Sequence, residues 1–243
     1  MNNLKVNGFL ILMPLSNIEL YYSSQEHISD EFISLVGDEF KHSVKVMRNI
    51  VGDNLYITNG AGLIFKTEIS SIEKDKLSTR IIETIKTGNK FENIFFCVPK
   101  LKNPDRFKFA VEKCVELGIT NFIVFESKRT VAKGTNIKRW EKIALAAMKQ
   151  SIRAYLPKIK LVKNLSDIAE SKGEKIIFEQ IAKRKFHFEF IMDKKYYFIF
   201  GPEGGLTENE INSFETDLIY SLSDNRLRSE TAIVKVAALI NSL

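Results

Sequence analysis

The sequence predicts an α/β protein in which a domain built on a parallel sheet follows a smaller β-rich domain. From residue 91 onward, short and nearly continuous apolar runs alternate with helix-forming segments, as in a parallel sheet covered by helices on both faces. Before residue 87, strand-like segments are separated by turn residues, which is typical of a small barrel. The polar stretch Thr87–Lys90 is the best linker, so we expect domains of residues 1–86 and 87–243.

The first domain is predicted to hold one helix and several strands. Phe40, Val44 and Met47 lie at helical spacing within residues 38–48. The sequence Asn-Gly-Ala-Gly at 59–62 tolerates positive φ and predicts a tight hairpin. The strands expected on these patterns are residues 55–58, 63–72 and 77–85.

The second domain is predicted to alternate strands and helices. The expected strands are residues 94–98, 122–125, 176–178, 196–200 and 218–222. The expected helices are residues 105–117, 137–151, 207–214 and 229–243. The last helix is strongly apolar, so we expect it to be buried in the core or against a partner.

Several protein classes are excluded early. No apolar run approaches the roughly 20 residues of a membrane-spanning helix. The run Phe9–Met13 lacks a convincing signal-peptide cleavage site and is interpreted as a strand. Cys97 and Cys114 cannot make a disulfide framework or a four-ligand zinc site, so we expect free thiols in a reducing cytoplasm. The three scattered histidines, His27, His42 and His187, predict no metal site.

The positive charge is concentrated in the middle of the chain. The formal net charge is +6, and residues 91–160 alone hold 15 basic and 6 acidic side chains. A concentrated basic field attracts polyanions by counterion release, which makes nucleic acid the leading partner class. The alternative, that Lys is simply frequent in this chain, does not explain why the excess is confined to one segment.

Two loops that follow predicted strands are the best candidates for chemistry, because ligands bind beyond the carboxyl ends of parallel strands. The first, Gly201–Gly205, holds three glycines and precedes a Thr207–Glu210 capping box. It matches neither the GxGxxG nor the Walker pattern. Glu203 disfavours a phosphate at this helix start and favours a cationic ligand, such as the sulfonium of S-adenosylmethionine.

The second loop, residues 223–231, brings two arginines to the same edge. Arg226 and Arg228 are solvated surface residues or ligand contacts, and Ser229 is the expected N-cap of the last helix. Arg153 closes the helix at 137–151, where its guanidinium either offsets the helix dipole or holds a phosphate or base carbonyl.

Seven segments in order resemble the ribosomal RNA small subunit methyltransferase E family of the SPOUT superfamily. The segments are HSVKVMR (42–48), GDNLYITNGAG (52–62), DRFKFAVEKCVELGI (105–119), ESKRTVAK (126–133), RWEKIALAAMKQSIR (139–153), FGPEGGLTENEI (200–211) and NRLRSETA (225–232). The chain departs from the family pattern at Lys149 and Ile152, where the family commonly has Glu and Gly. A smaller departure is Ser229, where the family usually has Thr.

This resemblance implies a PUA-like barrel followed by an α/β methyltransferase domain with a trefoil knot. It implies a homodimer that uses S-adenosylmethionine to methylate N3 of a uridine in the decoding region of 16S rRNA, within the small ribosomal subunit. The cofactor-binding residues expected on this basis are Glu179, Phe200, Gly201, Gly204, Gly205, Leu222, Asn225, Leu227, Arg228 and Thr231. The catalytic candidates are Arg153, Glu203 and Arg228. The phosphate-contacting candidates are Lys45, Arg48, Lys100, Arg106, Lys113, Arg129 and Lys133.

Two other functions fit part of the sequence. A non-catalytic RNA-binding or ribosome-assembly module would share the basic segment but would not bind the cofactor. A nucleotide-dependent oxidoreductase would share the sheet, but the missing GxGxxG counts against it.

Overall fold

A computed structural model describes residues 18–132, 134–187 and 194–242, which form two compact units. The first unit comprises the described residues up to Thr58 together with Phe65–Thr84. The second comprises Asn59–Ile64 and the described residues from Ile85 onward. The strand predicted at Phe9–Met13 lies outside the described residues.

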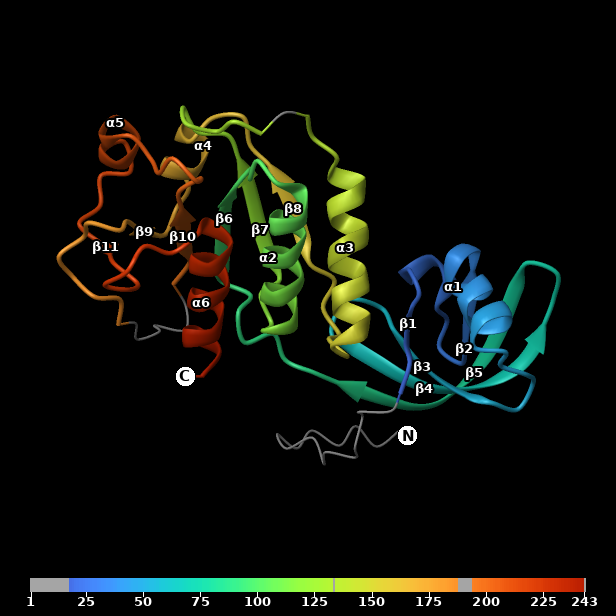
Figure 1. The fold of residues 1–243 in the computed structure, drawn as a ribbon. Helices are drawn as coiled ribbons and strands as arrows, with labels where there is room; N and C mark the ends of the chain where they lie inside the picture. The colour runs from blue at the N-terminus through green and yellow to red at the C-terminus, as the bar shows by residue number, and fades with distance from the viewer. Residues whose placement is uncertain (1–17, 133, 188–193, 243) are drawn as a thin grey trace. The chain divides into compact units, whose positions relative to one another are not determined.

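The first unit is built on a five-stranded mixed sheet with the order β1-β3-β4-β5-β2 (Figure 1). The strands are β1 (Leu20–Tyr22), β2 (Phe32–Val36), β3 (Asn54–Thr58), β4 (Leu63–Ile72) and β5 (Lys76–Lys86). The strands predicted from the turn residues are confirmed as β3, β4 and β5. Alternate apolar side chains along the strands of the sheet form the core, in which Ile33, Ile57 and Leu77 are fully buried.

The helical segment of the first unit changes its winding partway along. A 3-10 turn, η2 (Gln25–His27), precedes α1 (Gly37–Lys41), and α1 continues as η3 (His42–Val46), a π-helix. Phe40 is buried as its spacing predicts, but Met47 is exposed. The wider π turn rotates the inward face, so that Ser43 is buried instead.

The second unit is built on a six-stranded sheet with the order β11-β9-β10-β6-β7-β8, and every strand pair in it is parallel. The strands are β6 (Ile94–Pro99), β7 (Asn121–Phe125), β8 (Lys158–Leu161), β9 (Glu174–Phe178), β10 (Tyr196–Phe200) and β11 (Ile219–Tyr220). All five predicted strands are present. β8 was not predicted, because lysines alternate with apolar residues along this edge strand and interrupt the apolar run.

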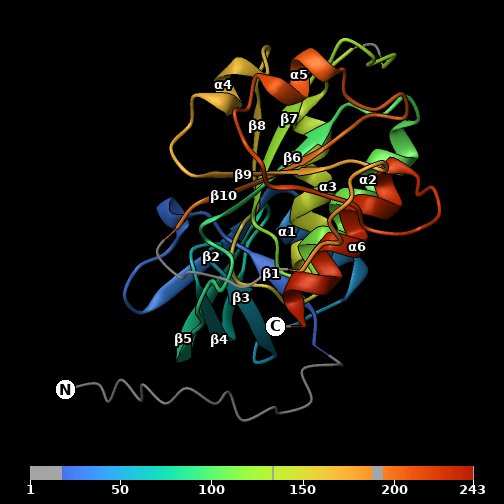
Figure 2. The ribbon, with the colours of Figure 1, turned by 90° about the vertical axis from the view of Figure 1, so that its left-hand side faces the viewer.

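Three long helices cover one face of this sheet. α2 (Pro104–Glu116) packs against both α3 (Ile137–Gln150) and α6 (Ser229–Asn241), and lies between them (Figures 1 and 2). As expected, α6 buries its apolar stripe, including Ile233, Val236 and Ile240. The shorter α4 (Ser166–Ala169) and α5 (Glu208–Asn212) contribute Ile168 and Ile211 to a second apolar cluster with β7, β9 and β10.

The α/β class and the parallel sheet are therefore confirmed, whereas the trefoil knot stays a prediction. In the described part of the chain, no helix combines the length and the apolar character that crossing a membrane would require.

Ile152 adopts a left-handed backbone conformation, with φ of 55°. A β-branched residue is strained there, and this is the position where the related family commonly has Gly. We expect Ile152→Gly to be more stable than Ile152→Ala by about 1 kcal/mol, because both variants lose the isoleucine side chain and only Gly relieves the strain. Urea unfolding of the two variants measures this difference, and a more stable Ala variant would contradict it.

Candidate functional site

A cavity of about 670 Å³ lies where β9 and β10 end. Parallel strands bring their carboxyl ends to one edge of a sheet, and this edge is where α/β proteins bind ligands. The cavity is lined by Arg106, Phe178, Glu179, Gln180, Phe200, Gly201, Pro202, Glu203, Gly204, Gly205, Leu222, Ser223, Arg226, Leu227, Arg228, Ser229 and Ala232. Both loops that the sequence singled out contribute to this lining.

The loop Gly201–Gly205, called the glycine loop below, lines the cavity and folds back tightly on itself. Gly205 has φ of +72°, and a Cβ atom added to Gly201 would lie 3.1 Å from Gly205 Cα. Side chains at these positions would fill the space into which the backbone turns. The glycines are therefore required by the loop's own tight turn, and the loop they form lines the cavity.

Arg129 holds this loop from the neighbouring β7–α3 connection. Its Nη1 donates hydrogen bonds to the carbonyl oxygens of Gly204, at 2.8 Å, and Leu206, at 3.3 Å. The expectation that Arg129 contacts RNA phosphate stays a prediction, because the residue is exposed; the structure adds that its Nη1 donates to the backbone of the glycine loop. Arg129 therefore supports the glycine loop without lining the cavity.

The helix after the glycine loop begins with the predicted capping box. Thr207 Oγ1 accepts from the Glu210 amide, and Glu210 Oε2 accepts from the Thr207 amide at 2.8 Å. The other carboxylate oxygen of Glu210 accepts from the Lys128 amide at 2.7 Å. Burial raises the pKa of Glu210, but these hydrogen bonds outweigh it and hold the pKa below its ordinary value. One carboxylate thus connects α5 to the β7–α3 connection.

The predicted N-cap of the last helix is wrong by one residue. Arg228 occupies the N-cap position of α6, and no side chain caps the helix there. The Ser229 hydroxyl instead donates to the Gly201 carbonyl oxygen at 2.7 Å. Ser229 therefore ties the start of α6 to the glycine loop.

Two carboxylates face the cavity in different environments. Glu179 is half-buried at the end of β9, and this burial raises its pKa although nearby Arg129 opposes the rise. Glu203 is exposed, and its Oε1 accepts from the Lys102 amide at 3.1 Å. The part of the cavity lined by Glu179 and Glu203 thus offers carboxylate oxygens to a cationic group.

Most of the expected cofactor-binding residues gather at this cavity. Glu179, Phe200, Gly201, Gly204, Gly205, Leu222, Leu227 and Arg228 line it. Asn225 and Thr231 are exposed and do not line it. Sequence reasoning missed Phe178, Gln180 and Ala232, although each is adjacent in the sequence to an expected cofactor-binding residue, which was a usable signal.

The expected phosphate-contacting residues are dispersed by the fold. Lys100 is only 4% exposed, and its Nζ lies 2.6 Å from Glu126 Oε1, so it is removed from the phosphate-contacting set. Lys113 pairs with Glu116 at 2.7 Å, and this hydrogen bond raises the pKa of Lys113. Lys45 and Arg48 are exposed in the first unit, and Lys133 lies outside the described residues. Arg106 lines the cavity itself.

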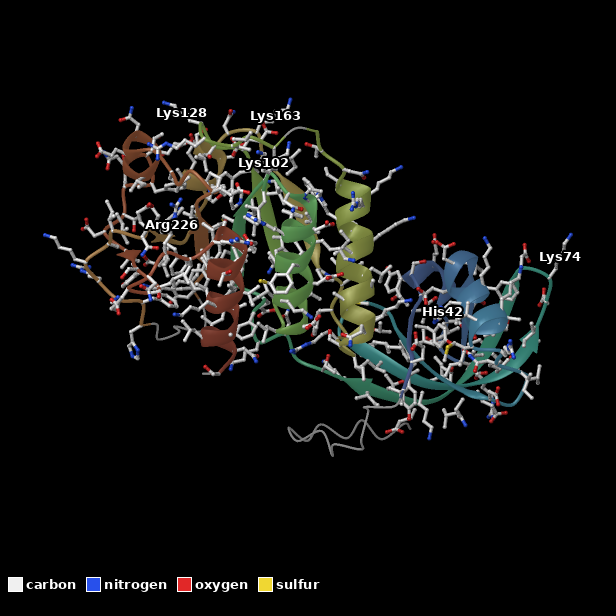
Figure 3. The ribbon with its side chains drawn as sticks, viewed as in Figure 1. His42, Lys74, Lys102, Lys128, Lys163 and Arg226 are labelled. Atoms are coloured by element: carbon white, nitrogen blue, oxygen red, sulfur yellow. The ribbon has the colours of Figure 1, made fainter. Side chains whose placement is uncertain are left out.

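Three exposed lysines missed by sequence reasoning lie near the cavity edge of the sheet. Lys102, Lys128 and Lys163 each follow a different parallel strand, β6, β7 and β8 respectively. Figure 3 shows them at one end of the second unit. Lys102 and Lys128 had a signal in the sequence, because each comes shortly after an apolar run, whereas Lys163 follows the strand β8 that the sequence did not predict.

Arg153 lies in a second, smaller cavity of about 190 Å³ that shares no lining residue with the first. Its Nη2 donates to the Glu116 carbonyl oxygen at 2.6 Å, and burial lowers its pKa. Within one chain, Arg153 is therefore not brought together with Glu203 and Arg228. In the described ranges, no group of three or more His, Cys, Asp and Glu side chains is arranged to hold a metal.

Comparisons with known families place this chain in a known class of proteins. The chain matches a model of the RNA methyltransferase domain over residues 89–241 and one of the RNA methyltransferase PUA domain over residues 35–82. The class is therefore that of RNA methyltransferases with a PUA domain.

The particular family follows from two curated relatives, both called ribosomal RNA small subunit methyltransferase E. The protein from Bacillus subtilis is 29% identical over 82% of this chain and 85% of the relative. The protein from Mesomycoplasma hyopneumoniae is 34% identical over 63% of this chain and 72% of the relative. The chain belongs to the ribosomal RNA small subunit methyltransferase E family.

A solved member of this family has the same fold. The enzyme from Neisseria gonorrhoeae, crystallised with S-adenosylmethionine, superposes with a TM-score of 0.81 over 93% of this chain and 97% of that chain. The two sequences are 23% identical, so this likeness concerns the fold.

The Glu210 contacts predict a pH-dependent contribution to stability. Because the folded-state pKa is lowered, this contribution is complete above the ordinary pKa of 4.5 and is lost as the pH falls below it. We expect Glu210→Gln to cost about 1 kcal/mol at pH 7 and progressively less between pH 4.5 and pH 3. Urea unfolding across this range measures the gap, with the exposed Glu208→Gln as the matched control. A gap that does not change with pH would contradict the assignment.

Proposed function

We propose that this protein uses S-adenosylmethionine to methylate N3 of a uridine in the decoding region of 16S rRNA, on the assembled small subunit. The carrying observation is the cavity between the glycine loop and the start of α6, in a chain of this methyltransferase family. Its position at the carboxyl edge of a parallel sheet is the expected one for a nucleoside-containing cofactor.

The cavity residues fit this cofactor in shape and charge. The side-chain-free surface of Gly201, Gly204 and Gly205 leaves peptide groups open to a ligand. Apolar side chains suited to an adenine ring come from Phe178, Phe200, Leu222 and Leu227. Glu179 would face a positively charged group. When bound, the cofactor supplies an activated methyl group on a sulfonium.

The work left to the protein is placement and charge stabilisation. An N3–CH₃ bond forms as the sulfur–methyl bond breaks, and the N3 proton is released, with S-adenosylhomocysteine as the other product. Loss of that proton places negative charge on the flanking carbonyl oxygens of the base. Arg228 lines the cavity and is our candidate to stabilise this charge. Glu203 is our candidate to accept the proton or to orient the backbone beside it.

We further propose that the enzyme acts as a homodimer. The role predicted for Arg153 at the acceptor base needs a second copy of the chain, because Arg153 lines a separate cavity within its own chain. The exposed Leu239 on α6 adds an apolar side chain suited to such an interface.

The direct test is methyl transfer from labelled S-adenosylmethionine to small subunits that lack the modification, followed by mapping of the methylated base. We expect one methyl group, on N3 of one uridine. Small-subunit binding without transfer or cofactor binding would instead support the non-catalytic RNA-binding module. An increase in melting temperature with NAD or NADP, and none with S-adenosylmethionine, would support an oxidoreductase.

The lysines at the cavity edge predict a specific salt dependence of RNA binding. Replacing Lys102, Lys128 and Lys163 together with Gln should make the slope of log affinity against log salt shallower by roughly two to three, because about three phosphate contacts are lost. The matched control replaces Lys158, Lys172 and Lys195, exposed lysines at the amino ends of β8, β9 and β10. Filter binding at several salt concentrations gives both slopes, and equal slopes for the two triple variants would refute this surface.

A further inference from the structure

Glu230 is a buried carboxylate beside the cavity with an incomplete set of partners. It lies in the first turn of α6 and is 7% exposed. Its Oε2 has no hydrogen-bond partner among the described residues. Burying a carboxylate is costly unless it is paired, so its position calls for an explanation beyond packing.

The partner of Glu230 is Arg106, which comes from α2, another helix that starts at this edge. Arg106 lies in the first turn of α2, and its Nε is 3.5 Å from Glu230 Oε1. The arginine side chain is 35% exposed and lines the cavity, whereas the glutamate lies behind it. The glutamate therefore holds the guanidinium at the wall of the cavity.

Arg106 is paired with a carboxylate, and this distinguishes it from the other arginines that line the cavity. In the described parts of the chain, no ion pair is found for Arg226 or Arg228, both of which are exposed. An arginine carries five N–H donors, and contact through Nε leaves the Nη donors for a second partner. A guanidinium held by a buried carboxylate loses less conformational freedom when it binds that partner.

We propose that Arg106 is the anion-binding group of this cavity and that Glu230 is its positioning residue. The ligand is a negatively charged oxygen. This proposal rests on the proposed function, which offers two such oxygens. One belongs to the carboxylate of the cofactor's methionine moiety, and the other is a carbonyl oxygen of the acceptor base that gains charge as the N3 proton leaves. Both oxygens suit a guanidinium donor.

The test uses Arg106→Gln, Glu230→Gln and the double variant, with Lys108→Gln as the control. Lys108 lies on the same helix, is exposed and does not line the cavity. Calorimetry compares the affinities for S-adenosylhomocysteine and for 5′-methylthioadenosine, which lacks the amino-acid moiety. Single-turnover methyl transfer to small subunits that lack the modification, at saturating S-adenosylmethionine, gives the rate of the chemical step. Melting temperatures show whether each variant is folded. If Arg106→Gln does not fold, Arg106→Lys, which keeps a positive charge opposite Glu230, takes its place.

We expect Arg106→Gln to impair one of these steps while the Lys108→Gln control leaves both unchanged. A roughly tenfold or greater loss of S-adenosylhomocysteine affinity, with 5′-methylthioadenosine unaffected, identifies the cofactor carboxylate. A loss of about 100-fold in the single-turnover rate, with unchanged affinities, identifies the acceptor base. Unchanged affinities and rate in folded Arg106→Gln or Arg106→Lys would overturn the proposal.

The positioning role of Glu230 has its own signature. Glu230→Gln should impair the same step as Arg106→Gln but less severely, and the double variant should be no worse than Arg106→Gln alone, because both act through one contact. Independent, multiplicative losses would overturn that role. Absence of methyl transfer by the wild-type protein would reject the proposed function. The affinities for S-adenosylhomocysteine and 5′-methylthioadenosine would still show whether Arg106 binds the carboxylate of the amino-acid moiety.

Discussion

The parallel arrangement of the six strands in the second unit is the constraint on which the site depends. It brings the carboxyl ends of all the strands to one edge, so loops far apart in the sequence meet there. The glycine loop after β10 and the segment between β11 and α6 form the cavity for this reason. The exposed Lys102, Lys128 and Lys163 follow three other strands toward the same edge.

Polar contacts between loops then hold this edge in one arrangement. Ser229 binds the carbonyl of Gly201, and Arg129 binds that of Gly204. Glu210 joins its own capping box to the amide of Lys128. Each contact satisfies a backbone group that a loop would otherwise leave to solvent, so the glycine loop keeps its shape although three of its five residues are glycines. The site is therefore supported mostly by residues that need not touch a ligand.

Burial, more than position in the sequence, decides which basic side chains of the segment are available to a ligand. Lys100 and Lys102 are two residues apart, yet Lys100 is buried against Glu126 whereas Lys102 is exposed at the cavity edge. Arg106, four residues after Lys102, is held at the cavity wall by Glu230. The same basic segment thus supplies a structural ion pair, an exposed cation and a cavity-facing cation. The net charge of the segment indicated the class of partner without indicating which cations meet it.

The sequence by itself determined the α/β class, the predicted strands and main helices, the two cavity loops and the membership of a family, because these depend on local periodicity, turn chemistry and ordered motifs. It missed β8, whose alternating lysines hide an edge strand, and it misplaced the N-cap of α6. Only the tertiary structure decided that Arg153 and Arg228 line different cavities, and that Arg129 and Ser229 brace the glycine loop. These outcomes depend on contacts between residues distant in the chain, and local spacing carries no information about which distant side chain will bury, pair with or support another.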